Sequence, residues 1–143
     1  MLSWNDLNSL TELHREKKRI EDRIEQLRAS ATRTSPQLDG MPHGSVHRDI
    51  MAEYAANYDE AMRHLSAVEA RLADRIDRIE LEIRSAHMSP QETAVIWTRF
   101  AEGKTIGQTA HELHYSRSGT YKIYKKGLDT LLRKEWTHLD TDP

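Results

Sequence analysis

The sequence predicts an all-α fold, in which a long N-terminal helical hairpin or coiled coil is followed by a small helix-turn-helix domain. Of the 143 residues, 37% are apolar and 31% are charged, a balance that favours long solvated helices over a thick core. Apolar residues recur every three or four positions through two long stretches, and three shorter segments with capping residues follow. We expect residues 1–86 to form the coiled-coil-like region, 88–136 the helix-turn-helix domain and 137–143 a flexible tail.

The composition excludes several classes of protein. The chain has no cysteine, so disulfide scaffolds, thiolate metal sites and cysteine nucleophiles are excluded. No apolar run approaches the roughly 20 residues that span a bilayer, and the N-terminus lacks the basic and apolar regions of a secretory signal. We therefore expect a cytoplasmic protein with no membrane partner.

The first predicted helix covers about residues 3–31. Ser3 and Asn5 are suited to cap its start, and Asp6 in the first turn suits the positive end of the helix dipole. Its apolar stripe follows heptad spacing, with Lys17 at one seam position: Leu10, Leu13, Ile20, Ile24 and Leu27. A Pro/Gly loop at 32–46 is predicted to follow, and its DGMPHGS segment either forms a tight turn or serves as a contact surface.

The second predicted helix covers about residues 47–86, which contain no proline or glycine. Its stripe also advances by three or four positions: Met51, Tyr54, Tyr58, Ala61, Leu65, Val68, Leu72, Ile76, Ile79 and Ile83. The first helix can cover only about two thirds of the second. The surplus apolar surface favours a homo-oligomer formed through the N-terminal helices, and packing within one chain or between chains both remain open.

Residues 88–136 contain the start signals of three short helices. Ser89, followed by Pro90 and Glu92, opens the first, which we expect to place Trp97 and Phe100 in the domain core. Thr105 caps the second helix, and Ser116 caps a longer third one that runs to about residue 136. Two helices joined by a tight turn, the second of them cationic, are typical of a helix-turn-helix.

Helix-turn-helix packing requires a small residue midway along the first helix and apolar residues at set offsets. Ala110 meets the first requirement, and the predicted inward residues are Leu113, Tyr115, Ile123 and Leu128. Three positions depart from the usual pattern. His114 occupies the turn where glycine is common, and Thr109 and Thr120 occupy inward positions that usually hold aliphatic side chains.

The outward face of the third helix is the candidate DNA-binding surface, because residues 114–134 hold six basic side chains against one acidic one. The side chains predicted to read bases in the major groove are Arg117, Ser118, Tyr121 and Lys122. Those predicted to contact phosphates are Lys104, Thr105, Ser116, Lys125 and Lys126. Periodicity alone is equally compatible with a small helical domain whose cationic face is merely solvated.

Residues 89–132 also resemble region four of bacterial sigma factors and related response-regulator domains. The matching positions are Ser89, Glu92, Gly103, Ala110, Ser116, Thr120, Gly127 and Leu128. Over nearly the whole chain, the order of long helix, DGMPHGS segment, long helix and C-terminal sigma-like domain is similar to phage late-gene regulators of the ArpU/RinA group. This resemblance implies a prophage-encoded activator of late genes in a Gram-positive host, which acts with the host RNA polymerase.

We predict neither catalysis nor a metal or other cofactor. The pairs His111/His114 and His43/His47 lack a third ligand at suitable spacing. The acidic residues of 69–82 alternate with arginines, as in solvated helix faces. The phosphate-binding loop, the serine nucleophile elbow and the HExxH helix are all absent from the sequence.

Two other functions compete with a DNA-binding regulator. A small-terminase-like packaging subunit also combines helices with a DNA-binding domain, although there the DNA-binding domain usually comes first. A polymerase-binding adaptor would use the helices to bind RNA polymerase and would not contact DNA.

Overall fold

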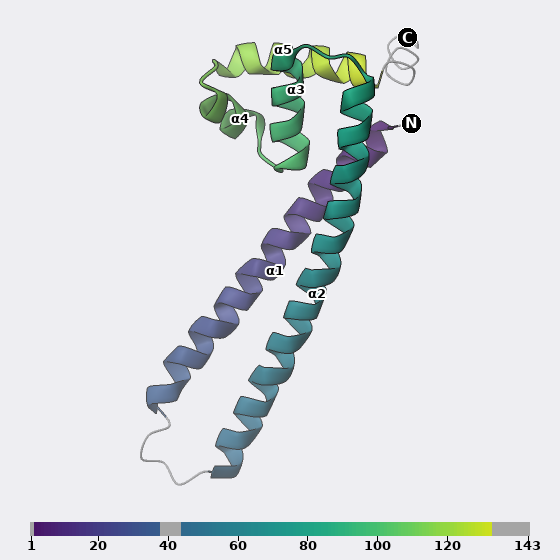
Figure 1. The fold of residues 1–143 in the computed structure, drawn as a ribbon. Coiled ribbons are helices and arrows are strands. Elements are labelled where there is room, and N and C mark those ends of the chain that lie inside the picture. Colours follow the sequence, from purple (N-terminus) through teal and green to yellow (C-terminus); the bar gives the residue numbers. More distant parts are fainter. Residues whose placement is uncertain (1, 38–43, 133–143) are drawn as a thin grey trace, which may run out of the picture. The chain divides into compact units, whose positions relative to one another are not determined.

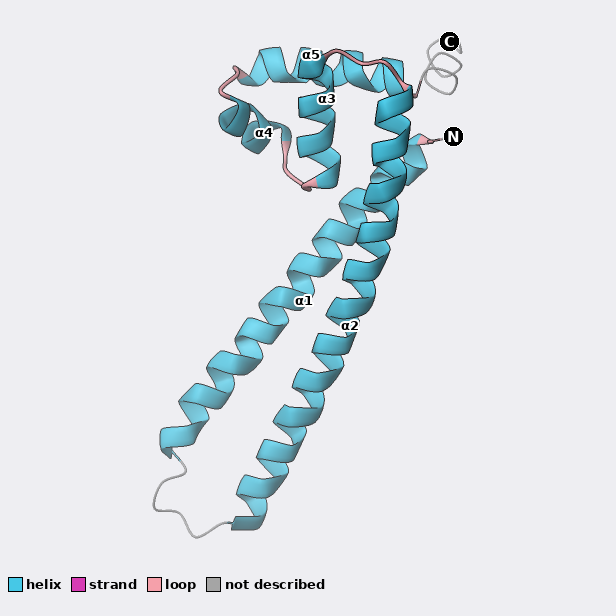
Figure 2. Ribbon diagram, in the orientation of Figure 1, coloured by secondary structure: helices cyan, strands magenta, loops and turns pink. Residues whose placement is uncertain are grey.

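The computed structural model describes residues 2–37 and 44–132, and it describes the side chains of 2–32 and 50–132. Within these ranges the chain is helical and contains no strand, which confirms the predicted all-α class (Figures 1 and 2). The elements are α1 (Trp4–Gln37), α2 (Gly44–Ser85), α3 (Pro90–Ile96), the π-helical turn η1 (Trp97–Ala101), α4 (Ile106–Leu113) and α5 (Arg117–Leu131).

Contacts divide the chain into two compact units. One unit contains Met1–His14 and Leu72–Pro143, and the other contains Arg15–Arg71. The three short helices therefore share a unit with the start of α1 and the end of α2. The predicted domain division at residues 86–88 remains a prediction, and the predicted tail at 137–143 lies outside the described residues.

In the unit formed by Arg15–Arg71, α1 and α2 lie side by side and run in opposite directions (Figure 1). The Arg28 guanidinium donates to the Tyr58 hydroxyl at 2.9 Å, and His64 Nε2 donates to a Glu16 carboxylate oxygen at 3.0 Å. The predicted stripes supply the buried apolar side chains Ile20, Ile24, Ala61 and Val68. Amphipathic periodicity thus identified the packed faces of both helices.

The predicted place of Met51 in the stripe of α2 is wrong, because its side chain is 49% exposed. Met51 lies in the early turns of α2, about two turns before Tyr58. Helical spacing places Met51 in register with the buried Ala61 and Val68, but burial also needs a facing side chain, which the period of one helix does not predict.

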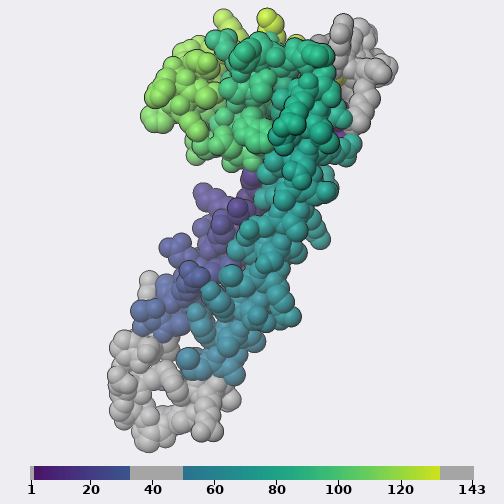
Figure 3. Space-filling model, viewed as in Figure 1, coloured from purple at the N-terminus to yellow at the C-terminus, as the bar shows by residue number. Residues whose placement is uncertain are grey.

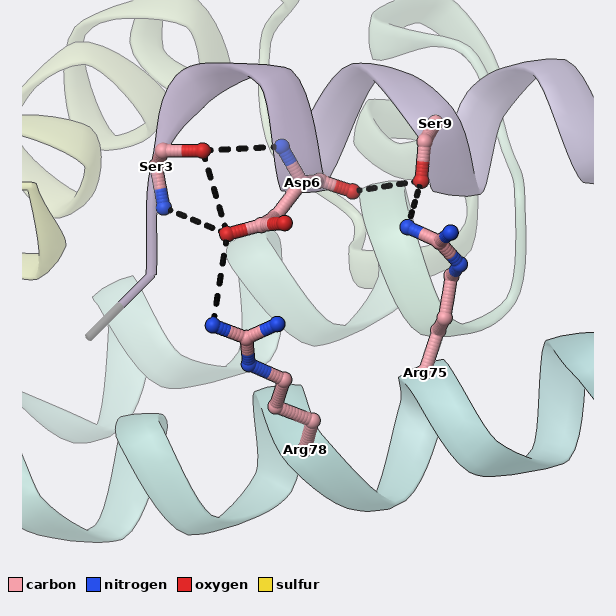
Figure 4. A network of polar contacts seen from close by, with 5 residues as sticks. All are labelled: Ser3, Asp6, Ser9, Arg75 and Arg78. Atoms are coloured by element: carbon pink, nitrogen blue, oxygen red, sulfur yellow. Dashed lines mark hydrogen bonds and ion pairs between the residues drawn. The ribbon is translucent and has the colours of Figure 1, made fainter.

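In the other unit, the start of α1 packs against the end of α2 (Figure 4). Ser3 caps α1 reciprocally with Asp6: the Asp6 amide donates to Ser3 Oγ at 3.2 Å, and the Ser3 amide donates to Asp6 Oδ2 at 2.9 Å. Arg78 lies 3.6 Å from the same carboxylate, and Arg75 donates to Ser9 Oγ. Leu7 extends the buried stripe one step before its predicted start at Leu10, and Leu2, just before α1, is buried as well.

The environment of Asp6 lowers its pKa. Burial, the largest single influence, acts to raise the pKa of Asp6, but the amide and hydroxyl of Ser3 together with Arg78 and Arg75 outweigh it and bring the value below 3.8. Asp6 therefore stays ionised at neutral pH and joins the start of α1 to the end of α2.

The predicted loop at 32–46 is too long and must be corrected. Helix α1 continues to Gln37, and α2 already begins at Gly44. Residues 32–35 contain neither proline nor glycine, and Pro36, which cannot donate an amide hydrogen bond, comes only in the last turn, one residue before the helix ends. Of the DGMPHGS segment, residues 39–43 lie outside the described part of the chain.

The short helices enclose a small core. Its buried apolar side chains are Val95, Ile96, Phe100, Ala101, Ala110, Leu128 and Leu132. Phe100 is 1% exposed, as predicted, whereas Trp97 is only half-buried. Helix α5 ends at Leu131, and the predicted continuation through residues 133–136 lies outside the described residues.

Candidate nucleic-acid interface

The connection between α4 and α5 consists of His114, Tyr115 and Ser116. His114 adopts the left-handed conformation with φ 61° and ψ 39°, which glycine usually supplies and which histidine tolerates better than most residues. The amide of Tyr115 donates to the Ala110 carbonyl at 2.9 Å and closes the end of α4. The unusual residue at this turn therefore still gives the backbone path that a tight turn requires.

Both helices start with well-formed caps. Thr105 and Gln108 form a reciprocal capping box on α4, with distances of 3.1 Å and 3.0 Å. Ser116 caps α5 by accepting a hydrogen bond from the Gly119 amide at 3.0 Å. These two predicted caps are confirmed.

The inward threonines are satisfied rather than strained. Thr109 and Thr120 are both fully buried, and each hydroxyl donates to the carbonyl four residues earlier, that of Thr105 and that of Ser116 respectively, at 2.8 Å. A buried hydroxyl that keeps a hydrogen bond costs little. This explains why threonine can occupy positions where aliphatic side chains are usual.

The other inward residues divide into two groups. Ala110 and Leu128 are buried, as predicted, and Leu113 and Ile123 are partly buried. The prediction for Tyr115 is wrong, because its side chain is 36% exposed. Tyr115 lies between the left-handed His114 and the cap residue, in the connection rather than on the packed face of either helix.

Helix α5 crosses α3 at Gly127. A Cβ atom at this position would lie 2.8 Å from Cγ1 and 3.2 Å from Cδ1 of the fully buried Ile96. Glycine is therefore required for the close approach of the two helices. The crossing buries Gly127 and Leu128 and leaves the opposite side of α5 in solvent.

That opposite side carries the predicted base-reading residues and two of the three lysines predicted to contact phosphates. Each of these side chains is exposed: Arg117, Ser118, Tyr121, Lys122, Lys125 and Lys126. None of the four cations forms an ion pair with a residue that the structure describes. Their positive charge is thus available to an external anion.

Aromatic side chains connect this face to the core. Lys125 Nζ lies 6.0 Å from the centre of the Tyr121 ring, which lies 6.2 Å from the Tyr124 ring. Tyr124 in turn stacks at 6.0 Å on the buried Phe100. Burial raises the pKa of Tyr124 above 10, so that its hydroxyl stays neutral at physiological pH.

Lys104 stands apart from the other predicted contacts. Its ammonium is hydrogen-bonded to Glu112 and lies 3.8 Å from a Glu102 oxygen. The hydrogen bond to Glu112 raises the pKa of Lys104, so the lysine is charged but already compensated. Lys104 is therefore less suited to attract a phosphate than the cations of α5, which have no ion-pair partner in the part of the chain that the structure describes.

Sequence reasoning missed one contact that holds the short helices. His14 Nε2 donates to the Phe100 carbonyl at 3.0 Å, and the imidazole lies against Gly103. Gly103 has φ +72°, and a Cβ there would come within 2.5 Å of the His14 ring. The sequence marked Gly103 as a helix end, but it held no signal for its partner 89 residues earlier.

Other types of site receive no support from the described residues. Among them, no group of three or more His, Asp or Glu side chains is arranged to hold a metal ion. None of the described helices is both long enough and apolar enough to span a membrane. Comparisons with known proteins found no matching family model, no similar curated protein and no similar solved structure.

Proposed function

We propose that this chain is a sequence-specific double-stranded DNA-binding transcriptional regulator. In this proposal α4, the connection at His114–Ser116 and α5 act as a helix-turn-helix, and α1 with α2 forms the helical hairpin that precedes it. The observation that carries the proposal is the exposed face of α5, on which four cations have no intramolecular ion pair among the described residues.

The face offers two kinds of contact to a duplex. Arg117 and Lys122 can donate to the O6 and N7 atoms of guanine, and Ser118 and Tyr121 can each add one hydrogen bond in the major groove. Lys125 and Lys126 lie further along the helix and suit the phosphates that position a protein without reading sequence. Thr105 and Ser116 use their hydroxyls as caps, so they would contact phosphate through the amides at the starts of their helices.

The resemblance to sigma region four and to phage late-gene regulators suggests the biological setting. On that basis the chain is a phage or prophage activator that works with host RNA polymerase in the cytoplasm. Two alternatives give different results in solution. An eight- or nine-membered ring would favour a packaging subunit, and retention of a polymerase without binding to any duplex would favour an adaptor.

The direct test is to select binding sites from a random duplex library and to compare the selected duplex with a scrambled one at a stated salt concentration. We expect the selected duplex to bind about 10³-fold more tightly or better at physiological salt. Arg71→Ala is the matched control, because Arg71 is an exposed cation on α2 and should leave the ratio unchanged. Equal affinities for the two duplexes would contradict sequence-specific regulation.

A further inference from the structure

One side of α2 carries a second regular pattern, which is distinct from the stripe that faces α1. Its members follow one another at alternating steps of four and three residues, the spacing of a coiled-coil seam. We call this set the outer seam: Asp59, Arg63, Ser66, Ala70, Ala73, Asp77, Glu80 and Arg84. All eight lie within α2, and all but the half-exposed Glu80 are exposed.

No side chain of the described residues covers the outer seam. At about 100° per residue, its members point about 150° away from the buried stripe that contains Ala61, Val68, Leu72 and Ile79. Two large apolar side chains adjoin the seam, and both are exposed: Met62 at 36% and Leu81 at 64%. The space-filling view shows side chains of α2, in teal, at the surface along the helix (Figure 3).

The sequence of the outer seam is complementary to its own reverse. Reading from the two ends toward the middle, Asp59 corresponds to Arg84 and Arg63 to Glu80, so each outer position carries the opposite charge of its counterpart. Ser66 corresponds to Asp77, a hydroxyl donor to a carboxylate acceptor, and Ala70 corresponds to Ala73. The point of symmetry lies between Arg71 and Leu72.

We propose that the outer seam binds the outer seam of a second copy of this chain, with the two α2 helices antiparallel about that point. In the dimer, each of these correspondences becomes a contact between chains and occurs twice. Met62 of one copy then meets Leu81 of the other at both ends, and the alanines at the centre allow the helices to approach closely.

Ion pairs within each copy already hold four of the charged side chains of the outer seam next to one another. Asp59 and Arg63 form a pair at 2.8 Å, and Glu80 and Arg84 form another at 2.8 Å. Antiparallel pairing brings each Asp59–Arg63 pair against a Glu80–Arg84 pair, and this produces a four-membered network of alternating charge at both ends. Networks of this kind contribute more than isolated surface ion pairs.

Other arrangements of the same helices are disfavoured. A parallel dimer in register would place Asp59 against Asp59 and Arg63 against Arg63. An antiparallel dimer shifted by one heptad would oppose Asp59 to Asp77 in one direction, and Ala70 to Glu80 in the other. Of these arrangements, only the symmetric register pairs Asp59 with Arg84 and Arg63 with Glu80, places Asp77 against a hydroxyl, and buries Met62 and Leu81.

The first test measures the mass of the full chain by sedimentation equilibrium. We expect a dimer of the 16.6 kDa chain, and we expect Arg63→Glu and Glu80→Arg each to raise the dimer dissociation constant about tenfold or more, because each reversal makes two contacts repulsive. An equimolar mixture of the two variants should recover the dimer, since the glutamate introduced in one chain then faces the arginine introduced in the other. Arg71→Glu lies off both faces and should change nothing, and circular dichroism checks that every variant remains helical.

The second test determines by disulfide formation whether the two α2 helices are parallel or antiparallel. The chain has no cysteine, so only the introduced cysteines can form a disulfide. In the proposed dimer Ala70 faces Ala73 of the other copy. Mixing Ala70→Cys with Ala73→Cys chains should therefore give a cross-linked dimer, whereas each variant alone should not. Cross-linking of each variant alone would indicate a parallel dimer and overturn the proposal. A monomer at all concentrations, or an oligomer unaffected by the charge reversals, would also overturn it.

The proposal does not rest on DNA binding, since neither test contains DNA. A chain that dimerises through the outer seam but does not distinguish DNA sequences would refute the proposed function alone. A chain that binds a selected duplex as a monomer would refute the dimer alone.

Discussion

Gly127 offers a sharp test of how α5 is held, because two glycine-to-alanine substitutions in neighbouring helices should have opposite effects. In a helix, alanine is favoured over glycine by about 1 kcal/mol. At Gly127 the new methyl group would lie 2.8 Å from Ile96 Cγ1, a distance that forces a side chain or a helix to move. At Gly107, the nearest atom outside the helix backbone is Thr105 Oγ1 at 3.9 Å, an ordinary contact.

The change in the free energy of unfolding follows from two effects, the helix propensity of alanine and the steric overlap of the new methyl group. Ile96 is fully buried and cannot move into solvent, so overpacking should cost about 1–3 kcal/mol. After the gain in helix propensity is subtracted, Gly127→Ala should lower the free energy of unfolding by about 1 kcal/mol. Gly107→Ala should raise it by roughly 0.5 kcal/mol, because it gains the propensity without the clash.

Urea unfolding followed by circular dichroism measures both values. Adding Ile96→Ala provides a further check, because the truncated side chain makes room for the new methyl group. In the double-mutant cycle, Gly127→Ala should then cost less than it does alone, or should even stabilise. Equal stabilisation by the two alanines in the otherwise unchanged chain would refute a tight crossing at Gly127.

Three further predictions follow from the interface and the caps. Arg117→Ala should weaken binding to the selected duplex by about 1–3 kcal/mol and relax its specificity, whereas Lys126→Ala should weaken selected and scrambled duplexes alike; fluorescence anisotropy titrations distinguish the two patterns. Ser116→Asp should preserve the melting temperature because aspartate also caps helices, but it should weaken DNA binding by adding a negative charge; unchanged binding would argue against contact at this end of α5. Because folding lowers the pKa of Asp6, its ionised carboxylate stabilises the folded chain above the unfolded pKa of about 3.9, and this stabilisation is lost as pH falls through the folded pKa. Asp6→Asn should therefore lower the free energy of unfolding by less than about 1 kcal/mol at pH 7 and by progressively less below about pH 4. Urea titrations across that pH range would test it, and a difference that does not change with pH would contradict it.

Several features of the fold could be predicted because local chemistry decides them. The apolar period identified the packed faces of α1 and α2, and the residues that cap helices located the starts of α3, α4 and α5. The exposure of the cationic side of α5 followed from the same periodicity, because Thr120, Gly127 and Leu128 fix which side is buried.

Other features could not be predicted because they depend on contacts far apart in sequence or on backbone direction. The contact of His14 with Gly103 and Phe100 joins elements that no periodic pattern relates. The compensation of Lys104 by Glu112 depends on how the chain turns between η1 and α4. Tyr115 has a large aromatic side chain of the kind that often packs in a core, but its place in the connection between α4 and α5 leaves it exposed.

The central claim is that the outward face of α5 contacts double-stranded DNA. The most direct measurement is an NMR titration of the labelled chain with a selected duplex, which follows every backbone amide. The account predicts that the largest shifts fall on residues 116–126, with smaller changes at the start of α4. Shifts confined to α1 and α2, or no shifts at duplex concentrations that saturate binding, would contradict it.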